Sequence, residues 1–411
     1  MLKLEKRQNP SRFWLYATPV AAVVLTIVAG FILFAFLLEP DASKLVTDPD
    51  AGWFETLKGR ILADYGRPAA VIRTIFWDPL FGPFAGYTRG QLLVKAGPLI
   101  LIAVGLALGF RAGIWNIGAE GQYIMGALVG ASVALAFYPS GPVEVSWLWG
   151  AIAFTWDMTL PRWILFPLAV LAGAFGGWVW AMIPAVLKTR FNTNEILVSL
   201  MLVYVAQTFL AKAATGFLRN PESAGFPGSR NFSGFAEAAN PFWIAGSGLH
   251  WGGAAALGLA VLAYILLTRH LLGFQIRLAG QAPRAARFHG VSPARLVLLC
   301  MGISGVLAGL AGWFEVSGPA RQISINFNTG YGFTAIIVAF LGRLNPLGIV
   351  LAGFLMALTY VGGEMAATNL NLPSAAIQVF QGMLLFFLLG VDVMTNYRFR
   401  FVPGAMAKGA R

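Results

Sequence analysis

A polar segment interrupts a long apolar run in the first half of the chain. Residues 110–122 read FRAGIWNIGAEGQ and break an apolar stretch that extends over residues 99–137. Asn116 is a hydrogen-bonding amide, Glu120 is ionisable, and the glycines of the segment disfavour a continuous helix. Such groups are costly at membrane depth unless they face protein or a water-filled path. This segment is therefore the first candidate for a functional site.

Two interpretations of these polar groups are open. Trp115 and Asn116 offer a ring face and an amide, which together can stack a planar ligand and hydrogen-bond its edge. Glu120 and Asn116 can also satisfy the broken backbone around Gly118, and this structural role does not exclude the first. Together with Gln122, these side chains form one half of the predicted substrate path.

A second polar segment, NFNTGYG at residues 326–332, precedes a short apolar stretch. Two asparagines, two glycines and a tyrosine at such a place indicate an unwound helix start, on the membrane side opposite the first break. Asn326, Asn328 and Tyr331 complete the predicted substrate path.

The basic segment 268–295 is the next candidate. It contains five arginines and no acidic residue, together with many alanines and glycines. Pro283 is expected to open a short helix that brings Ala285, Ala286 and Phe288 near one another, and Gly290 is expected to end it. A short helix with a small apolar face and basic flanks suits docking into a groove on a partner. A basic loop that only fixes the membrane topology explains the same residues.

Asn194 and Glu195 stand just before another apolar stretch. Glu195 either caps a helix start, where the helix dipole favours a carboxylate, or has a functional role. Enzyme motifs are absent from the sequence, which has no HExxH, CxxC or GxSxG, and no cofactor or metal is expected. The phosphate-binding motif GxxxxGK[ST] is absent too, so any work driven by ATP needs another subunit.

The composition is that of a membrane protein. Of 411 residues, 58% are hydrophobic and 11% are charged, and the mean hydropathy is +0.71, so too few polar residues are present to cover a water-soluble surface. The formal net charge of +12 comes from basic residues in short connections between apolar stretches, which is the positive-inside pattern. The single cysteine, Cys300, excludes an intrachain disulfide.

Ten apolar stretches are candidates for membrane spans. They lie at Ala17 to Leu38, Gln91 to Phe110, Glu120 to Phe137, Trp163 to Leu187, Ile196 to Lys212, Trp251 to Leu267, Leu296 to Val316, Tyr331 to Leu341, Pro346 to Gly363 and Ser374 to Val391. An even number places both termini on one side, and the basic connections identify that side as the cytoplasm. We predict an all-α polytopic membrane protein of about ten helices, with broken helices near the membrane midplane.

Short sequence repeats add two expectations about packing. The triplet Phe-Asn-Thr at residues 191–193 and 327–329 fits an inverted repeat or a chance match. Glycine pairs four residues apart predict close helix packing. These pairs are Gly126 with Gly130, Gly173 with Gly177, and Gly305 with Gly309.

Four motifs carry a resemblance to a known family. In chain order they are FRAGIWNIGAEGQ, RFNTNEILVSLML, LGFQIRLAGQAPRAARFHGV and TGYGFTAIIVAFLGRLNPLG. The chain resembles the permease subunits of bacterial ABC importers for simple sugars, nucleosides and branched-chain amino acids, and it is most similar to the nucleoside-import permeases. The similarity extends from about Gln91 to Val391. Val203 departs from it, because many relatives have asparagine there, which indicates a different ligand or an asparagine supplied by a partner permease.

The resemblance implies a set of partners. These are a second permease or a copy of the chain, two ATP-binding cassette subunits on the cytoplasmic face, and an extracytoplasmic solute-binding protein. The chain is then a transport subunit in the bacterial inner membrane, surrounded by membrane lipid, with no nucleic acid as partner. Its basic segment is the ATPase-coupling element, with Gly280, Pro283, Ala285, Ala286 and Gly290 as the motif positions.

The implied organisation has four parts. They are a cytoplasmic segment at 1–16, a first helix and outer loop at 17–90, the permease domain at 91–395 with the coupling loop 268–295, and a cytoplasmic tail at 396–411. The implied cargo is a nucleoside or a related sugar-containing solute moved into the cell, and ribose or another simple sugar is the alternative.

Two other function classes are alternatives. An ion-coupled secondary transporter needs carboxylates inside the membrane, and Glu120, Glu315 and Glu364 are available. A membrane enzyme needs His, Asp or Cys clustered at a membrane face, and the sequence shows no such cluster.

Overall fold

The computed structural model describes residues 2–6, 12–38, 66–138, 143–147, 152–156, 160–223, 225–241, 249–327 and 330–401. The chain forms two compact units, Met1–Ala85 with Leu358–Arg411, and Gly86–Ala357. The predicted site residues all belong to the second, larger unit.

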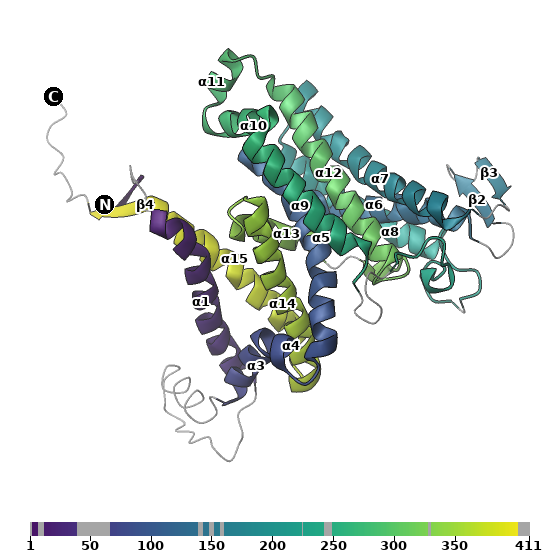
Figure 1. Ribbon diagram of the computed structural model, residues 1–411, viewed down its shortest axis with the longest axis horizontal. Helices are drawn as coiled ribbons and strands as arrows, with labels where there is room; N and C mark the ends of the chain where they lie inside the picture. Colours follow the sequence, from purple (N-terminus) through teal and green to yellow (C-terminus); the bar gives the residue numbers. More distant parts are fainter. Residues whose placement is uncertain are drawn as a thin grey trace, which may run out of the picture. The chain divides into compact units, whose positions relative to one another are not determined.

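The elements of both units are drawn in Figure 1. The smaller unit contains α1 (Arg12–Leu37), α3 (Gly66–Phe76), α4 (Asp78–Phe81) and α15 (Ser374–Asn396). The larger unit contains α5 (Ala85–Arg111), α6 (Ala119–Ala136), α7 (Arg162–Phe191), α8 (Glu195–Thr215), α9 (Trp251–Arg269), α10 (Leu271–Gln281), α11 (Pro283–Phe288), α12 (Pro293–Ser317) and α13 (Tyr331–Leu341), with the 3-10 helices η1 (Phe232–Gly234) and η2 (Ile325–Phe327). The boundary between the units falls inside α14 (Pro346–Leu370).

Every predicted span coincides with a helix, and among the described residues eight helices are long and apolar enough to cross a membrane. α6 is not one of the eight, because Glu120 and Gln122 in its first turn lower the hydropathy of its 18 residues. α13 has 11 residues, which agrees with the short eighth span expected from the sequence. The chain is an all-α polytopic membrane protein.

Two short antiparallel ribbons accompany the helices and were not predicted. β1 (Leu2–Lys6) pairs with β4 (Tyr397–Phe401) and brings the two ends of the chain together. β2 (Val143–Trp147) pairs with β3 (Ile152–Trp156) in the connection between α6 and α7.

Glycines allow α6, α7 and α12 to pack side by side in the larger unit (Figure 1). A Cβ atom added at Gly126 of α6 would overlap the backbone of Gly309 in α12, and one added at Gly177 of α7 would overlap the backbone of Gly305. Side chains at these positions would therefore force the helices apart. The close packing expected from the glycine spacing is confirmed.

The smaller unit has its own core between α1 and α15. The rings of Phe34 and Phe380 stack with their centroids 5.8 Å apart, and Gly30 leaves room for the Phe380 ring. Ile75 of α3 packs in the same hydrophobic cluster and is fully buried.

A buried histidine caps the start of α9. Nδ1 of His250 accepts a hydrogen bond from the Gly252 N–H at 3.1 Å and lies 3.2 Å from Nδ2 of Asn240. Asn240 Oδ1 accepts from the Trp251 N–H, so the segment before α9 is tied to the helix start from both sides. Burial lowers the pKa of His250 from 6.5 to about 4, because the charged imidazolium would lose its water.

Candidate functional site

The break between α5 and α6 is a short loop over residues 112–118. Gly113 turns the chain with φ of +75°, a conformation that glycine adopts without strain. Gly118 lies against Ser199 of α8, and a Cβ atom there would come within 2.8 Å of the Ser199 carbonyl oxygen. The loop thus packs tightly between helices.

Asn116 fixes this loop to two helices. Its Nδ2 donates to Oε1 of Gln122 and to Oγ of Ser304, both at 2.9 Å. Its Oδ1 accepts from Nε2 of Gln122 at 3.1 Å and from the Gly118 N–H at 3.0 Å. Asn116 and Gln122 are 2% and 1% exposed, respectively. Because the amide of Asn116 is fully used by protein partners, the side chain joins the loop to α6 and α12.

Glu120 joins the first break to the second one, which is the polar segment before α13. It is fully buried, Oε1 accepts from the Gly330 N–H at 3.1 Å, and Oε2 accepts from the Gly332 N–H. These donors stand at the start of α13, where backbone N–H groups have no partner within the helix. Gly330 precedes that helix with φ of +78°. The carboxylate of α6 therefore caps α13, a contact between residues 210 positions apart.

Aromatic rings surround the start of α13. Tyr123 of α6 stacks on Phe327 with centroids 5.2 Å apart and meets Tyr331 edge-on at 6.0 Å. Nζ of Lys95, on α5, lies 5.8 Å from the centroid of the Tyr331 ring. Tyr331 is fully buried, so its ring takes part in the contact of α5, α6 and α13.

A second aromatic group includes the one exposed side chain of the first break. Trp115 is 40% exposed, and its ring lies 5.0 Å from that of Phe110 and 5.9 Å from that of Phe340. Phe110 and Phe340 stack on each other at 5.3 Å. The ends of α5 and α13 thus hold a tryptophan ring in a fixed place while part of its surface is open.

The seven predicted path residues do not share one environment. Asn116, Glu120, Gln122 and Tyr331 are buried in contacts with protein, whereas Trp115 and Asn326 are exposed. Asn328 lies outside the described residues. The structure thus joins the two predicted breaks through Glu120 and leaves Trp115 as an exposed aromatic surface beside the first.

The basic segment folds as two helices, α10 and α11, beyond the ends of α9 and α12 (Figure 1). α11 begins at Pro283 and ends just before Gly290, whose φ is +76°. Ala286 is buried, Ala285 is half-buried, and Phe288 is 94% exposed. Ala286 therefore packs inward, whereas Phe288 is exposed, so Phe288 does not share the buried face on which the sequence led us to expect it.

α10 packs directly on the first break. A Cβ atom at Gly280 would overlap the carbonyl oxygen of Arg111, so the two backbones touch at the end of α5. Ile276 of α10 is fully buried in one cluster with Leu108 of α5 and Ile114 of the loop. A movement of α10 therefore has to move the break or separate from it.

Asn194 and Glu195 have partners at the start of α8. Asn194 Oδ1 accepts from the Ile196 N–H at 3.0 Å, the bond of a helix cap. Glu195 forms a 3.0 Å ion pair with Lys188 at the end of α7. Together they close the turn between α7 and α8.

Val203 lies in a contact between helices α8 and α6. It is 1% exposed, and its Cα is 3.2 Å from a Cβ built on Gly121 of α6. The position therefore belongs to the packing of α8 on α6 within this chain.

Several residues of the site were missed in the sequence. Lys95 had a signal, because a lysine within an apolar stretch is costly and needs a partner. Ser304, Phe110 and Phe340 had none, because a serine or phenylalanine in an apolar helix is ordinary. Among the described residues, no group of three or more His, Cys, Asp or Glu side chains could hold a metal ion.

Comparison with known protein families shows to which family the chain belongs. Residues 89–389 match the family described as "branched-chain amino acid transport system / permease component". The chain belongs to this permease family. The matched residues include both breaks, α10 and α11, so the site lies within the part that defines the family.

Three curated relatives match most of the chain. It is 31% identical to the glucose ABC transporter permease TsgB13 of Haloferax volcanii, over 97% of this chain and 93% of that protein. It is 29% identical to the guanosine ABC transporter permease NupP of Bacillus subtilis, over 81% and 87%, and 28% identical to the nucleoside ABC transporter permease NupB of Lactococcus lactis, over 76% and 82%. No solved structure gives a significant match.

Proposed function

We propose that the chain is the membrane-spanning subunit of an ABC importer that takes up a nucleoside. The main support for this cargo is the indole ring of Trp115, which is exposed and lies against Phe110 and Phe340 beside the polar break. A purine or pyrimidine base is planar and stacks on such a ring. Relatives named for guanosine and nucleoside transport support this cargo.

The path of the solute follows the two breaks. Trp115 and Asn326 offer exposed contacts, and Asn328 belongs to the same segment as Asn326. Asn116, Gln122, Glu120 and Tyr331 set the shape of the path by fixing the breaks to neighbouring helices. Loose binding suits this task, because a permease must release its ligand and the solute-binding protein can supply the affinity.

The basic segment 268–295, called the coupling segment from here on, connects this path to an ATPase. Phe288 and the arginines of α11 form its outward surface, which suits docking on a cassette subunit in the cytoplasm. Gly280 and Ile276 carry movement of this surface to the end of α5. On this arrangement both termini are cytoplasmic and the membrane is the inner membrane. The partners are cassette ATPases, a second permease and an extracytoplasmic binding protein.

A sugar is the second candidate cargo. The glucose permease of Haloferax volcanii matches this chain along nearly its whole length, and indole rings also stack on sugar rings. A nucleoside carries a planar base and a simple sugar does not. Membership of the family does not distinguish the two cargoes, so an uptake measurement has to.

Uptake of radiolabelled nucleosides, ribose and glucose tests the proposal in cells that express the full set of subunits, with and without an inactivated ATPase. ATPase-dependent uptake of a nucleoside alone is the expected result, and dependence with a sugar alone favours the second candidate. Uptake that does not depend on the ATPase overturns the proposal and favours an ion-coupled transporter.

A pair of tryptophan variants tests the path. Trp115→Leu should raise the KM for a nucleoside roughly tenfold, the effect of losing one base stack. Trp178→Leu is the matched control, because Trp178 is 41% exposed and stacks on Phe175 at 5.9 Å, but it belongs to α7 and not to the break. Equal effects of the two substitutions would contradict a role for Trp115 in the path.

A further inference from the structure

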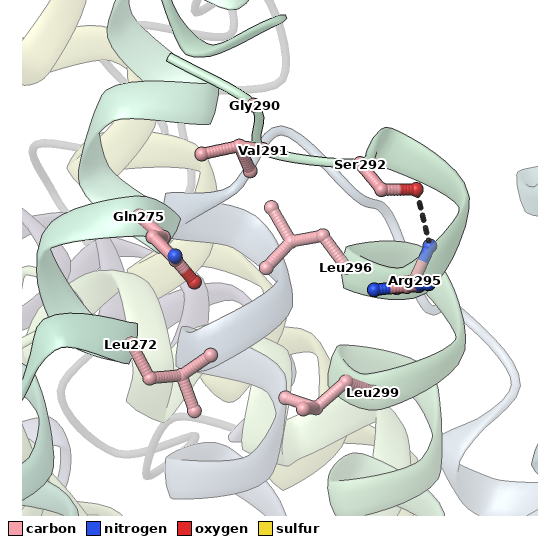
Figure 2. A pocket seen from close by; sticks show the side chains of 8 residues that line it. All are labelled: Leu272, Gln275, Gly290, Val291, Ser292, Arg295, Leu296 and Leu299. Atoms are coloured by element: carbon pink, nitrogen blue, oxygen red, sulfur yellow. Dashed lines mark hydrogen bonds between the residues drawn. The ribbon is translucent and has the colours of Figure 1, made fainter.

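A pocket of about 250 Å³ lies between α10 and the first two turns of α12 (Figure 2). Its floor is apolar, and Figure 2 shows Leu272 of α10 and Leu299 of α12 facing each other across it. Gln275 lies on the α10 side, and Ser292 and Arg295 lie on the α12 side. The pocket is therefore amphipathic, with a polar edge and an apolar interior.

The pocket lies at the level where two spans leave the membrane. α9 ends at Arg269, just before Leu272, and α12 begins at Pro293. At the rise of an α-helix, Leu299 is about 9 Å below the start of α12, within the hydrocarbon layer if that helix spans the bilayer. A ligand that fills the pocket therefore has to extend from the polar membrane surface into the hydrocarbon layer.

The polar edge has unused binding capacity. The side chains of Gln275 and Arg295 make no hydrogen bond or ion pair with any described residue. The whole segment 268–295 carries five arginines and no acidic residue, and none of these arginines pairs with a described carboxylate. Such a surface attracts an anion.

We infer that this pocket binds one anionic phospholipid of the inner leaflet. The phosphate lies at Arg295 with Gln275 and Ser292, and an acyl chain lies between Leu272 and Leu299. The inference rests on the proposed function in one respect, the cytoplasmic position of the segment. An ATPase surface is the less suitable occupant, because a water-soluble subunit does not reach the depth of Leu299.

The bound lipid would stabilise the coupling segment. It contacts α10 and α12 at once, and α10 touches the end of α5 at Gly280. A lipid wedged between α10 and α12 holds α10 in its place on the break. We therefore expect the coupling of ATP hydrolysis to transport to be tighter when the lipid is present.

The test uses the assembled transporter in nanodiscs of phosphatidylcholine with a minor fraction of phosphatidylglycerol. Native mass spectrometry of the released complex counts the retained phosphatidylglycerol. One molecule per permease chain is expected. Arg295→Gln should weaken retention roughly fivefold, the effect of one arginine beside an anionic lipid. Leu272→Trp, which fills the pocket without changing charge, should abolish retention.

Two controls make the result decisive. Arg284→Gln removes an exposed arginine of α11 that does not line the pocket and should leave retention unchanged. Equal loss in this control means general charge attraction and overturns the inference. Displacement of the lipid by inorganic phosphate alone means that the pocket takes free phosphate, which overturns it as well.

The remaining outcomes separate this inference from the proposed function. A crosslink from position 299 to the ATPase would show that a protein occupies the pocket. Retained lipid together with uptake that ignores the ATPase would remove the proposed function and leave the lipid site. Normal ATPase-dependent nucleoside uptake without retained lipid would remove the lipid site only.

Discussion

Replacing Glu120 by glutamine tests whether its carboxylate caps α13 or meets a solute or ion. Both carboxylate oxygens accept backbone N–H groups, those of Gly330 and Gly332. Glutamine keeps one acceptor oxygen and turns an NH₂ group toward the other N–H donor, so one charge-assisted hydrogen bond is lost. Such a bond contributes about 1.5–3 kcal/mol, and the attraction of a carboxylate to a helix N-terminus adds up to about 2 kcal/mol. We expect Glu120→Gln to lower the free energy of unfolding by about 3 kcal/mol.

The assay is chemical unfolding of the purified permease in detergent, with uptake measured in parallel. Glu222→Gln is the control, because its carboxylate side chain is 75% exposed and lies 3.9 Å from Arg230, and exposed pairs contribute less than about 1 kcal/mol. Uptake should fall together with stability. A Glu120→Gln protein that is as stable as the wild type would refute the capping argument. Full stability with loss of uptake would instead identify the carboxylate as a contact of the solute or of a coupling ion.

Three further predictions concern other parts of the chain. Phe288→Asp should leave the permease inserted and folded but abolish its stimulation of the ATPase. Phe226 is 78% exposed and lies outside the basic segment, so Phe226→Asp should leave that stimulation intact. Equal ATPase rates in both variants would contradict docking through α11. Because the pKa of His250 is lowered to about 4, stability is full above pH 6.5 and falls as the pH drops toward 4, by about 3 kcal/mol in total, since the unfolded chain binds the extra proton. His250→Asn keeps an acceptor for the Gly252 N–H and should flatten that dependence in thermal melts; an unchanged slope would exclude His250 as its cause. Gly309→Val should cost at least about 2 kcal/mol, because α7 lies against Gly309, while Gly258→Val, where a Cβ meets open space, should be tolerated; similar yields of folded protein would contradict the close packing of α7 and α12.

The helices could be predicted from the sequence because hydropathy is a local property. A run of apolar side chains identifies a span wherever the rest of the chain lies, and all ten stretches are helices. Glycines four residues apart similarly predict close helix packing, as found between α6, α7 and α12, since close approach needs small residues on one helix face. The β1–β4 ribbon had no such signal, because its pairing depends on two segments at opposite ends of the chain.

The two breaks could be located from sequence, but their connection could not. Polar residues and glycines in an apolar run show that the backbone needs partners there. Which partner is used depends on tertiary packing: Asn116 bonds to Ser304, 188 positions away, and Glu120 bonds to Gly330, 210 positions away. A lone serine in an apolar helix gives no indication of this role. The sequence therefore indicates Glu120 as a site residue but does not indicate α13 as its partner.

The contacts of the described residues form one route from the coupling segment to both breaks. α10 lies on the carbonyl of Arg111 at the end of α5, and the loop that follows is fixed by Asn116 to α12 and α6. In the first turn of α6, Glu120 holds the start of α13, whose far end carries Phe340 beside Trp115. A displacement of α10 thus acts on α5 directly and on α13 through buried hydrogen bonds, which are costly to leave unpaired in the membrane. On the proposed docking of an ATPase at α11, we therefore expect both breaks to move together, and expect substitutions at Gly280 and at Glu120 to impair the same transport step.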